Sequence, residues 1–262
     1  MSIGHAHPAT GDIAVKFDSV SFSYGDLPVL KNASFHIHRG EFAAMVGPNG
    51  TGKTTVLKLI VGLEEPSAGR VELFGVSPGQ AAERRNKIGF VPQQPPADHA
   101  FPITVRDLVR MGLLRPLRGY AGENAAVNDA MEQAGISDLA HRCYRTLSGG
   151  QRRRAMVARA LASRPEILIL DEPTANMDTE SEARLFETLG VLKGSTTILV
   201  VTHDTEFVSA LTDRVLCLGD GGQKGVVQHR TEAVNTVLHN GSTYHGARVL
   251  HAENIPANEC CE

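Results

Sequence analysis

The chain has 262 residues, of which 42% are hydrophobic and 21% charged, and its net charge at pH 7 is −3. This composition excludes disorder for most of the chain and suffices for one large domain, or for one domain with a helical insertion and a tail. A net charge without basic excess argues against nucleic acid as the main partner.

The N-terminal part alternates apolar and polar side chains, which predicts antiparallel strands. Residues 13–24 alternate in this way, and residues 29–37 do so again after the turn-prone residues 25–28. The following run, Phe42-Ala43-Ala44-Met45-Val46, is apolar throughout and predicts a buried strand.

A glycine-rich loop follows this buried strand. Residues 47–54 match the pattern G-x-x-x-x-G-K-[ST], and residues 56–61 carry apolar side chains at helical spacing. The glycines let successive backbone N–H groups point at phosphate oxygens, and the helix directs its positive end at the same anion. Lys53 can reach the β- and γ-phosphates, and Thr54 can offer its hydroxyl to Mg²⁺. The predicted nucleoside triphosphate site comprises Gly47, Pro48, Asn49, Gly50, Thr51, Gly52, Lys53, Thr54 and Thr55.

The remainder of the chain predicts an α/β fold. Short β-like runs occur at residues 70–74, 88–91, 167–170, 197–201 and 214–218. Helical patterns separate the last four runs, which indicates a mostly parallel sheet covered by helices. Between these runs the pattern is a Pro-rich loop and then amphipathic stretches, at residues 92–102, 105–114, 124–134 and 150–161. We interpret residues of about 93–163 as an inserted helical subdomain.

A second anion site is predicted at Leu147-Ser148-Gly149-Gly150-Gln151, ahead of the helix at residues 152–163. Ser148 can cap this helix, and the two glycines can expose N–H groups at its positive end. The run Arg152-Arg153-Arg154 at the start of the helix is interpreted as a solvated face, because a duplex-binding surface needs charge spread more widely.

The run Ile167-Leu168-Ile169-Leu170-Asp171-Glu172 is an apolar strand that ends in two acids, which fits a Walker B element. Asp171 would hold Mg²⁺. Glu172 lies on the opposite side of the strand, where its carboxylate can orient and polarise the attacking water.

Together, these three motifs resemble those of the ATP-binding cassette (ABC) ATPases, and the resemblance extends from about residue 13 to residue 218. It implies a P-loop NTPase core with an N-terminal antiparallel β-subdomain and an inserted helical subdomain, spanning residues 12–218. It also implies that Tyr24 stacks on adenine and that Gln93 senses Mg²⁺ and the attacking water. Asp178 then anchors a dimer-contacting loop, and His203 contacts the γ-phosphate.

In this family, the signature residues complete the ATP site of a second copy. The resemblance therefore implies a two-fold symmetric dimer with ATP between one P-loop and the other signature helix. The signature residues are Ser148, Gly149, Gly150 and Gln151. The expected cofactors are ATP and Mg²⁺.

The resemblance also bears on the cargo. Residues 101–107, Phe-Pro-Ile-Thr-Val-Arg-Asp, resemble the corresponding segment in ATPase subunits of zinc, manganese and iron(II) importers. The expected partners are a second copy, an integral membrane permease and, through it, an extracytoplasmic metal-binding protein. Two alternatives stay open: an ABC ATPase subunit for another cargo (chelated iron, haem or lipid), or a non-transport ABC ATPase that acts on nucleic acid.

The length of the apolar stretches predicts where in the cell the protein is located. None approaches the roughly 18 residues of a membrane-spanning helix, and residues 1–11 lack the apolar core of a signal peptide. We therefore expect a peripheral protein at the cytoplasmic face of the membrane. The four cysteines show no paired framework, so they should remain thiols.

Beyond residue 219 the sequence is rich in Gly, His and polar residues, which predicts a loosely structured, partly flexible tail at residues 219–262. Side chains that suit Zn²⁺ occur there, but at no recognised ligand spacing. These are His229, His239, His245, His251, Cys260 and Cys261, and at the other end of the chain His5 and His7. We favour an incidental tail over a metal sensor.

Overall fold

The computed structural model describes residues 12–78, 86–93, 102–113, 119–175, 177–203, 211–219, 225–237 and 243–255. The chain divides into two compact units, one formed by residues 1–85 and 193–262 and the other by residues 86–192. Each unit is described by itself.

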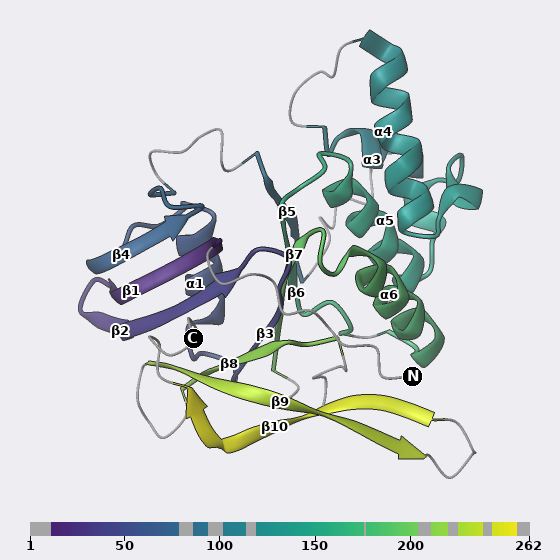
Figure 1. The fold of residues 1–262 in the computed structure, drawn as a ribbon. Helices are drawn as coiled ribbons and strands as arrows, with labels where there is room; N and C mark the ends of the chain where they lie inside the picture. The colour runs from purple at the N-terminus through teal and green to yellow at the C-terminus, as the bar shows by residue number, and fades with distance from the viewer. Residues whose placement is uncertain are drawn as a thin grey trace. The chain divides into compact units, whose positions relative to one another are not determined.

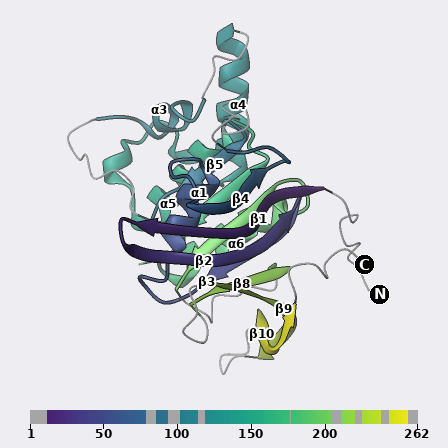
Figure 2. The same ribbon diagram turned by 90° about the vertical axis from the view of Figure 1, so that its left-hand side faces the viewer.

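The first unit contains a three-stranded antiparallel sheet in the order β2-β1-β4 (Figures 1 and 2). These strands are β1 (Ile13–Tyr24), β2 (Leu27–His38) and β4 (Ala68–Leu73). Phe17 lies opposite Phe35 in the β1–β2 register, and their buried rings stack with centroids 4.4 Å apart. Such cross-strand aromatic pairs stabilise an antiparallel ladder, so the predicted N-terminal β-subdomain is confirmed.

The same unit contains the parallel strands that carry the glycine-rich loop. Strand β3 (Phe42–Val46) lies between β7 (Thr197–Thr202) and β8 (Arg214–Leu218), parallel to both. All residues of these three strands are buried, as in parallel strands covered on both faces. Helix α1 (Lys53–Ile60) follows β3 after the loop. The predicted strand–loop–helix is therefore present.

The C-terminal residues correct our expectation of a loosely structured tail. Strand β9 (Val226–Val237) pairs antiparallel with β8, and β10 (Thr243–Ile255) pairs antiparallel with β9 (Figure 1). The expectation rested on polar composition. Strand pairing is made by backbone N–H and C=O groups, so polar side chains can occupy a strand that pairs with a neighbour.

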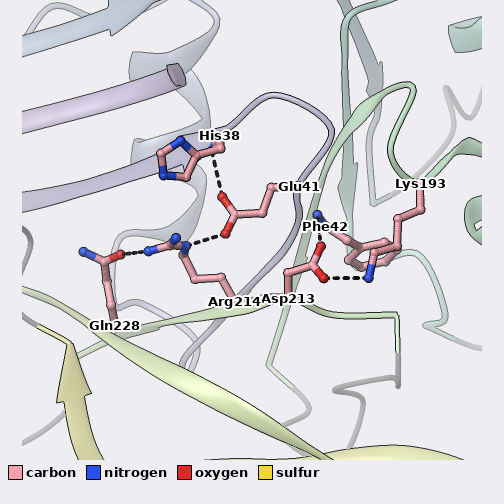
Figure 3. Close-up of polar contacts among 7 residues, drawn as sticks. All are labelled: His38, Glu41, Phe42, Lys193, Asp213, Arg214 and Gln228. Atoms are coloured by element: carbon pink, nitrogen blue, oxygen red, sulfur yellow. Dashed lines mark hydrogen bonds and ion pairs between the residues drawn. The ribbon is translucent and has the colours of Figure 1, made fainter. Parts of the chain in front are cut away.

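A buried polar network ties β9 to the turn between β2 and β3, as Figure 3 shows. Arg214 Nε lies 2.6 Å from Glu41 Oε1, and Arg214 Nη1 donates to Gln228 Oε1 at 2.7 Å. The second carboxylate oxygen of Glu41 accepts the backbone N–H of His38 at 2.7 Å. All four residues are buried. Because a buried charge without its partner is costly, Glu41 and Arg214 require one another.

The second unit combines two parallel strands with helices. Strand β5 (Ile88–Val91) pairs with β6 (Ile167–Asp171). The helices are α3 (Val105–Arg110), α4 (Gly119–Gln133), α5 (Gly149–Leu161) and α6 (Thr179–Leu192), with 3₁₀ turns at Ser137–Leu139 and Tyr144–Thr146. The α/β fold with a helical insertion is confirmed. The subdomain limits at residues 93–163 stay a prediction.

In the part of the chain that the structure describes, no helix is both long enough and apolar enough to span a membrane.

Candidate nucleotide site

The loop between β3 and α1 needs its glycines for two different reasons. Gly50 and Gly52 have φ angles of +85° and +101°, a region that other residues rarely adopt. Gly47 needs room instead, because a Cβ there would lie 2.7 Å from the carbonyl oxygen of Leu218. The curled backbone that cradles an anion therefore depends on the glycine positions of the motif.

Lys53 lies over this loop. Its buried Nζ donates to the carbonyl oxygens of Gly47 at 2.5 Å and Pro48 at 3.1 Å. The N-cap of α1 is Gly52, which offers no side-chain hydrogen bond to the amides of the first turn. Thr54 is exposed in that turn. A cation, a helix N-terminus and an accessible hydroxyl thus gather at one end of α1, as a triphosphate with its metal requires.

Tyr24 is the last residue of β1 and is 43% exposed. Its hydroxyl accepts a hydrogen bond from Lys58 Nζ at 3.0 Å and donates to Glu64 Oε1 at 3.4 Å. Phe22 packs edge-on against the ring, with centroids 4.8 Å apart. The hydrogen bond with Tyr24 is the main reason that the pKa of Lys58 is raised. An exposed ring that is held in place by Phe22 and by Lys58 of α1, the helix that follows the loop, can stack on a base.

His203 is brought to the glycine-rich loop by strand register. Val46, the last residue of β3, lies opposite Thr202, the last residue of β7. The next residues along the two strands are Gly47 and His203, and the His203 side chain is exposed. Because parallel strands end at the same edge of the sheet, His203 and the glycine-rich loop begin side by side at that edge.

The second unit gathers Gln93 with the two acids in the same way. Val91 of β5 lies opposite Leu170 of β6, so residues 92–93 and 171–172 leave the sheet side by side. Glu172 is 5% exposed and has φ +46°, a left-handed conformation that costs a residue with a side chain about 1–3 kcal/mol. Such strain persists only where the surroundings enforce it, and it occurs most often at functional sites.

The arginine run corrects a second expectation. Arg153 and Arg154 are only 6% and 7% exposed, so the predicted solvated face is wrong for both. Arg154 Nη1 donates to the carbonyl oxygen of Gly135 at 2.8 Å. Arg153 donates to carbonyl oxygens of Pro92, Gln93, Asp171, Glu172 and Pro173. Sequence reasoning missed Arg153, although helical spacing places it with the apolar Val157.

The signature segment begins α5 with the predicted cap. Ser148 Oγ accepts the backbone N–H of Gln151 at 3.2 Å, and Gln151 Oε1 accepts that of Ser148 at 3.1 Å. Ser148 and Gly149 are exposed, whereas Gly150 is buried. A Cβ on Gly150 would lie 2.2 Å from the Oγ of Ser181 at the start of α6. Gly150 therefore serves close packing of the two helix starts.

Asp178 organises the start of α6. Its carboxylate accepts the backbone N–H of Ser181 at 2.9 Å and the hydroxyl of Ser181 at 2.8 Å. These hydrogen bonds, the backbone one first, hold the pKa of Asp178 below its usual value. An N-terminal capping carboxylate explains this loop without any partner, so its dimer contact stays a prediction.

The importer-like segment folds as the entry to α3. Thr104 Oγ1 accepts the backbone N–H of Asp107 at 3.1 Å in a reciprocal capping box. The Thr104 hydroxyl is the main reason that the pKa of Asp107 is lowered.

Several sequence predictions fall outside the described residues or their described side chains. They concern His5, His7, Phe101, His239, His245, His251, Cys260 and Cys261. His229 is described and is 1% exposed in β9. Among the described residues, no group of three or more His, Cys, Asp or Glu side chains is arranged to hold a metal ion.

Comparisons with known proteins agree with these elements. The family model described as ABC transporter matches residues 30–175. A probable metal transport system ATP-binding protein of Chlamydia pneumoniae is 39% identical over 209 residues, covering 78% of this chain and 85% of that protein. The zinc uptake system ATP-binding protein ZurA of Listeria innocua is 37% identical over 211 residues, covering 78% and 82%.

Among solved structures, cbiO1 from Clostridium perfringens, described as part of the ABC transporter complex cbiONQ, superimposes with a TM-score of 0.74 at 29% identity. The match covers 83% of this chain and 88% of that one.

Proposed function

The chain belongs to the ABC transporter family as an ATP-binding, ATP-hydrolysing subunit, and from this premise we propose that it powers import of a divalent transition metal ion. Zinc is the first candidate, ahead of manganese and iron(II). The observation that carries this cargo is the similarity, over 78% of the chain, to relatives named for metal transport and zinc uptake. The sequence of residues 101–107, which resembles the corresponding segment of metal importers, supports the same assignment.

We assign nucleotide binding to the first unit. The backbone N–H groups of residues 47 and 49–55 surround the phosphates, since Pro48 has none to offer. The Lys53 ammonium exchanges its carbonyl partners in the loop for β- and γ-phosphate oxygens. The exposed ring of Tyr24 stacks on adenine. His203, at the end of β7, contacts the γ-phosphate.

The metal of the nucleotide is proposed to be Mg²⁺, held by Thr54, Gln93 and Asp171. Their donor chemistry fits, because Mg²⁺ prefers hydroxyl, amide and carboxylate oxygens. Thr54 and Gln93 are exposed, and Asp171 is half-buried at the end of β6. When bound, the ion neutralises charge that develops on the phosphates.

Hydrolysis is assigned to Glu172, with Gln93 beside it. The carboxylate of Glu172 accepts a proton from the attacking water or orients that water toward the γ-phosphate. Burial of the Glu172 side chain, at 5% exposure, limits competing bulk water, and its backbone conformation restricts the directions in which the carboxylate can point.

The working assembly is proposed to be a two-fold dimer in which Ser148, Gly149, Gly150 and Gln151 of each copy complete the ATP site of the other. ATP binds the closed dimer better than the open one, so hydrolysis reopens it. The dimer acts on a separate permease at the cytoplasmic face of the membrane. An extracytoplasmic metal-binding protein delivers the cargo, and nucleic acid takes no part.

The test is the elemental content of cells that lack this gene, grown under metal limitation. They are compared with cells complemented by the wild-type chain or by Glu172→Gln. We expect zinc or manganese uptake to fall and to be restored only by the wild type, because import needs ATP turnover. Unchanged metal content would reject the metal cargo and leave chelated iron, haem, lipid or a non-transport role to be tested.

A further inference from the structure

We propose that Arg153 is a positioning residue for ATP hydrolysis, because its guanidinium fastens helix α5 to the two loops that carry Gln93 and Glu172. The proposal deepens the proposed function and rests on the roles assigned there to Gln93 and Glu172.

The guanidinium distributes its donors over both loops. Nε donates to the carbonyl oxygen of Pro173 at 2.9 Å. Nη1 donates to the carbonyl oxygens of Gln93, at 3.1 Å, and Pro92, and Nη2 to those of Asp171, at 3.1 Å, and Glu172. All five acceptors are backbone carbonyl oxygens, so the contacts fix the backbone conformation of the two loops. Arg153 makes none of these five hydrogen bonds to the carboxylates of Asp171 and Glu172. A planar fork with five N–H donors can reach all of these carbonyls, whereas a lysine ammonium has three donors and can reach only some of them.

Because the Arg153 side chain is buried, it needs these hydrogen bonds. Arg153 is 6% exposed, and this desolvation is the main reason that its pKa is lowered, although the carboxylates of Asp171 and Glu172 act to raise it. A buried cation must find hydrogen-bond partners, and here the carbonyl oxygens of the two loops supply them. Moving either loop away would leave charged donors without partners.

The contacts also account for the unusual backbone of Glu172. Its φ of +46° is a conformation that residues with side chains rarely adopt, and it persists only when surrounding contacts enforce it. Arg153 binds the carbonyls of residues 171, 172 and 173, on both sides of the strained position. It thereby holds the peptide planes that set the direction of the Glu172 carboxylate.

The experiment compares Arg153→Gln and Arg153→Lys with Arg154→Gln in the full-length chain. Arg154 is the matched control, because it lies next in the same helix, is equally buried and binds Gly135 instead of the two loops. We expect Arg153→Gln to lower kcat for ATP by about ten- to hundredfold, since small misplacements of reacting groups have effects of this size. The KM for ATP should stay within about twofold of the wild-type value, because the loop of residues 47–55 is untouched. Arg153→Lys should recover part of kcat.

A second measurement tests whether Arg153 holds the two loops in place, and it does not require ATP hydrolysis. Hydrogen exchange in the absence of nucleotide should show faster exchange in peptides that cover residues 88–93 and 167–175 of Arg153→Gln. In Arg154→Gln, the faster exchange should instead lie near residue 135.

Wild-type kcat and wild-type exchange in Arg153→Gln would overturn the proposal. An equal loss of kcat in the two glutamine variants would also overturn it, since that pattern indicates general destabilisation. Failure of the assigned site chemistry is recognised separately, by a Glu172→Gln variant that still turns over ATP, because the exchange measurement does not depend on that chemistry.

Discussion

Glu172 is a residue whose chemistry and backbone point to the same conclusion, since it is a buried acid in a strained conformation at a strand end. Glu172→Gln keeps the shape of the side chain and removes the base. We expect phosphate release to fall by at least about a hundredfold, the usual contribution of a positioned base. ATP should still bind, so the variant should accumulate as an ATP-bound dimer, measured by size-exclusion chromatography with light scattering.

The control for this substitution is Glu180→Gln, an exposed carboxylate on α6 that pairs with Arg184. It should leave turnover unchanged, because surface pairs of this kind contribute little. Wild-type turnover in Glu172→Gln would remove Glu172 from its assigned role.

The buried His38 predicts how the free energy of unfolding depends on pH. It is 9% exposed, and desolvation lowers its pKa below 6.5, with Glu41 acting to raise the value and Arg214 to lower it. Below pH 6.5 the unfolded chain therefore binds a proton that the folded chain does not. Stability should fall as the pH drops from 6.5 toward the lowered pKa, by about 1.4 kcal/mol for each pH unit of that window.

The measurement is urea unfolding from about pH 7.5 to about pH 5.5, for the wild type and His38→Gln. The difference between the two free energies of unfolding should change below pH 6.5, because only the wild type carries this histidine. Two curves that stay parallel across the range would show that His38 does not titrate differently in the two states.

At the scale of elements, the starts of α5 and α6 are packed so closely that no side chain fits on Gly150. We expect Gly150→Ala to lower the free energy of unfolding by about 1–3 kcal/mol, the usual cost of forcing atoms into a packed contact. Because the clash is with Ser181, the same substitution should cost less in a Ser181→Gly background. Equal costs in the two backgrounds, measured by chemical unfolding, would assign the effect to the helix alone.

At the scale of the whole molecule, the contribution of β9 and β10 can be tested by truncation. A chain that ends at residue 225 loses the pairing of β9 with β8 and the Gln228 partner of Arg214. We expect a loss of about 3 kcal/mol or more, which corresponds to a melting temperature about 6–12 °C lower. A chain that lacks only residues 256–262 keeps all the described strand pairs and should melt like the wild type. Equal melting of all three chains would make the β9–β10 pair dispensable.

Zinc binding by the C-terminal residues is better tested by substitution than by truncation, because removing β9 also disturbs β8. His229 should be left in place for the same reason, since it is buried in the paired strand.

The amino-acid sequence by itself determined the features that depend on short-range spacing. Residues 47–54 identify the phosphate loop, Ser148 identifies the cap of α5, and apolar runs identify the buried strands β3, β6 and β7. These features follow from turn geometry, capping and burial within a dozen residues, so a local pattern suffices to predict them.

Only the tertiary structure decided which polar residues are buried and what they bind. The run of three arginines predicts a solvated Arg153, yet Arg153 is buried, and its acceptors lie 18–61 residues away along the chain. Likewise, the contacts of Arg214 with Glu41 and with Gln228 anchor β9. Glu41 and Gln228 lie 173 and 14 residues away from Arg214 along the chain. The energy of a buried charge depends on the partners that the fold brings next to it. Local composition cannot predict these partners, because they lie far away along the chain.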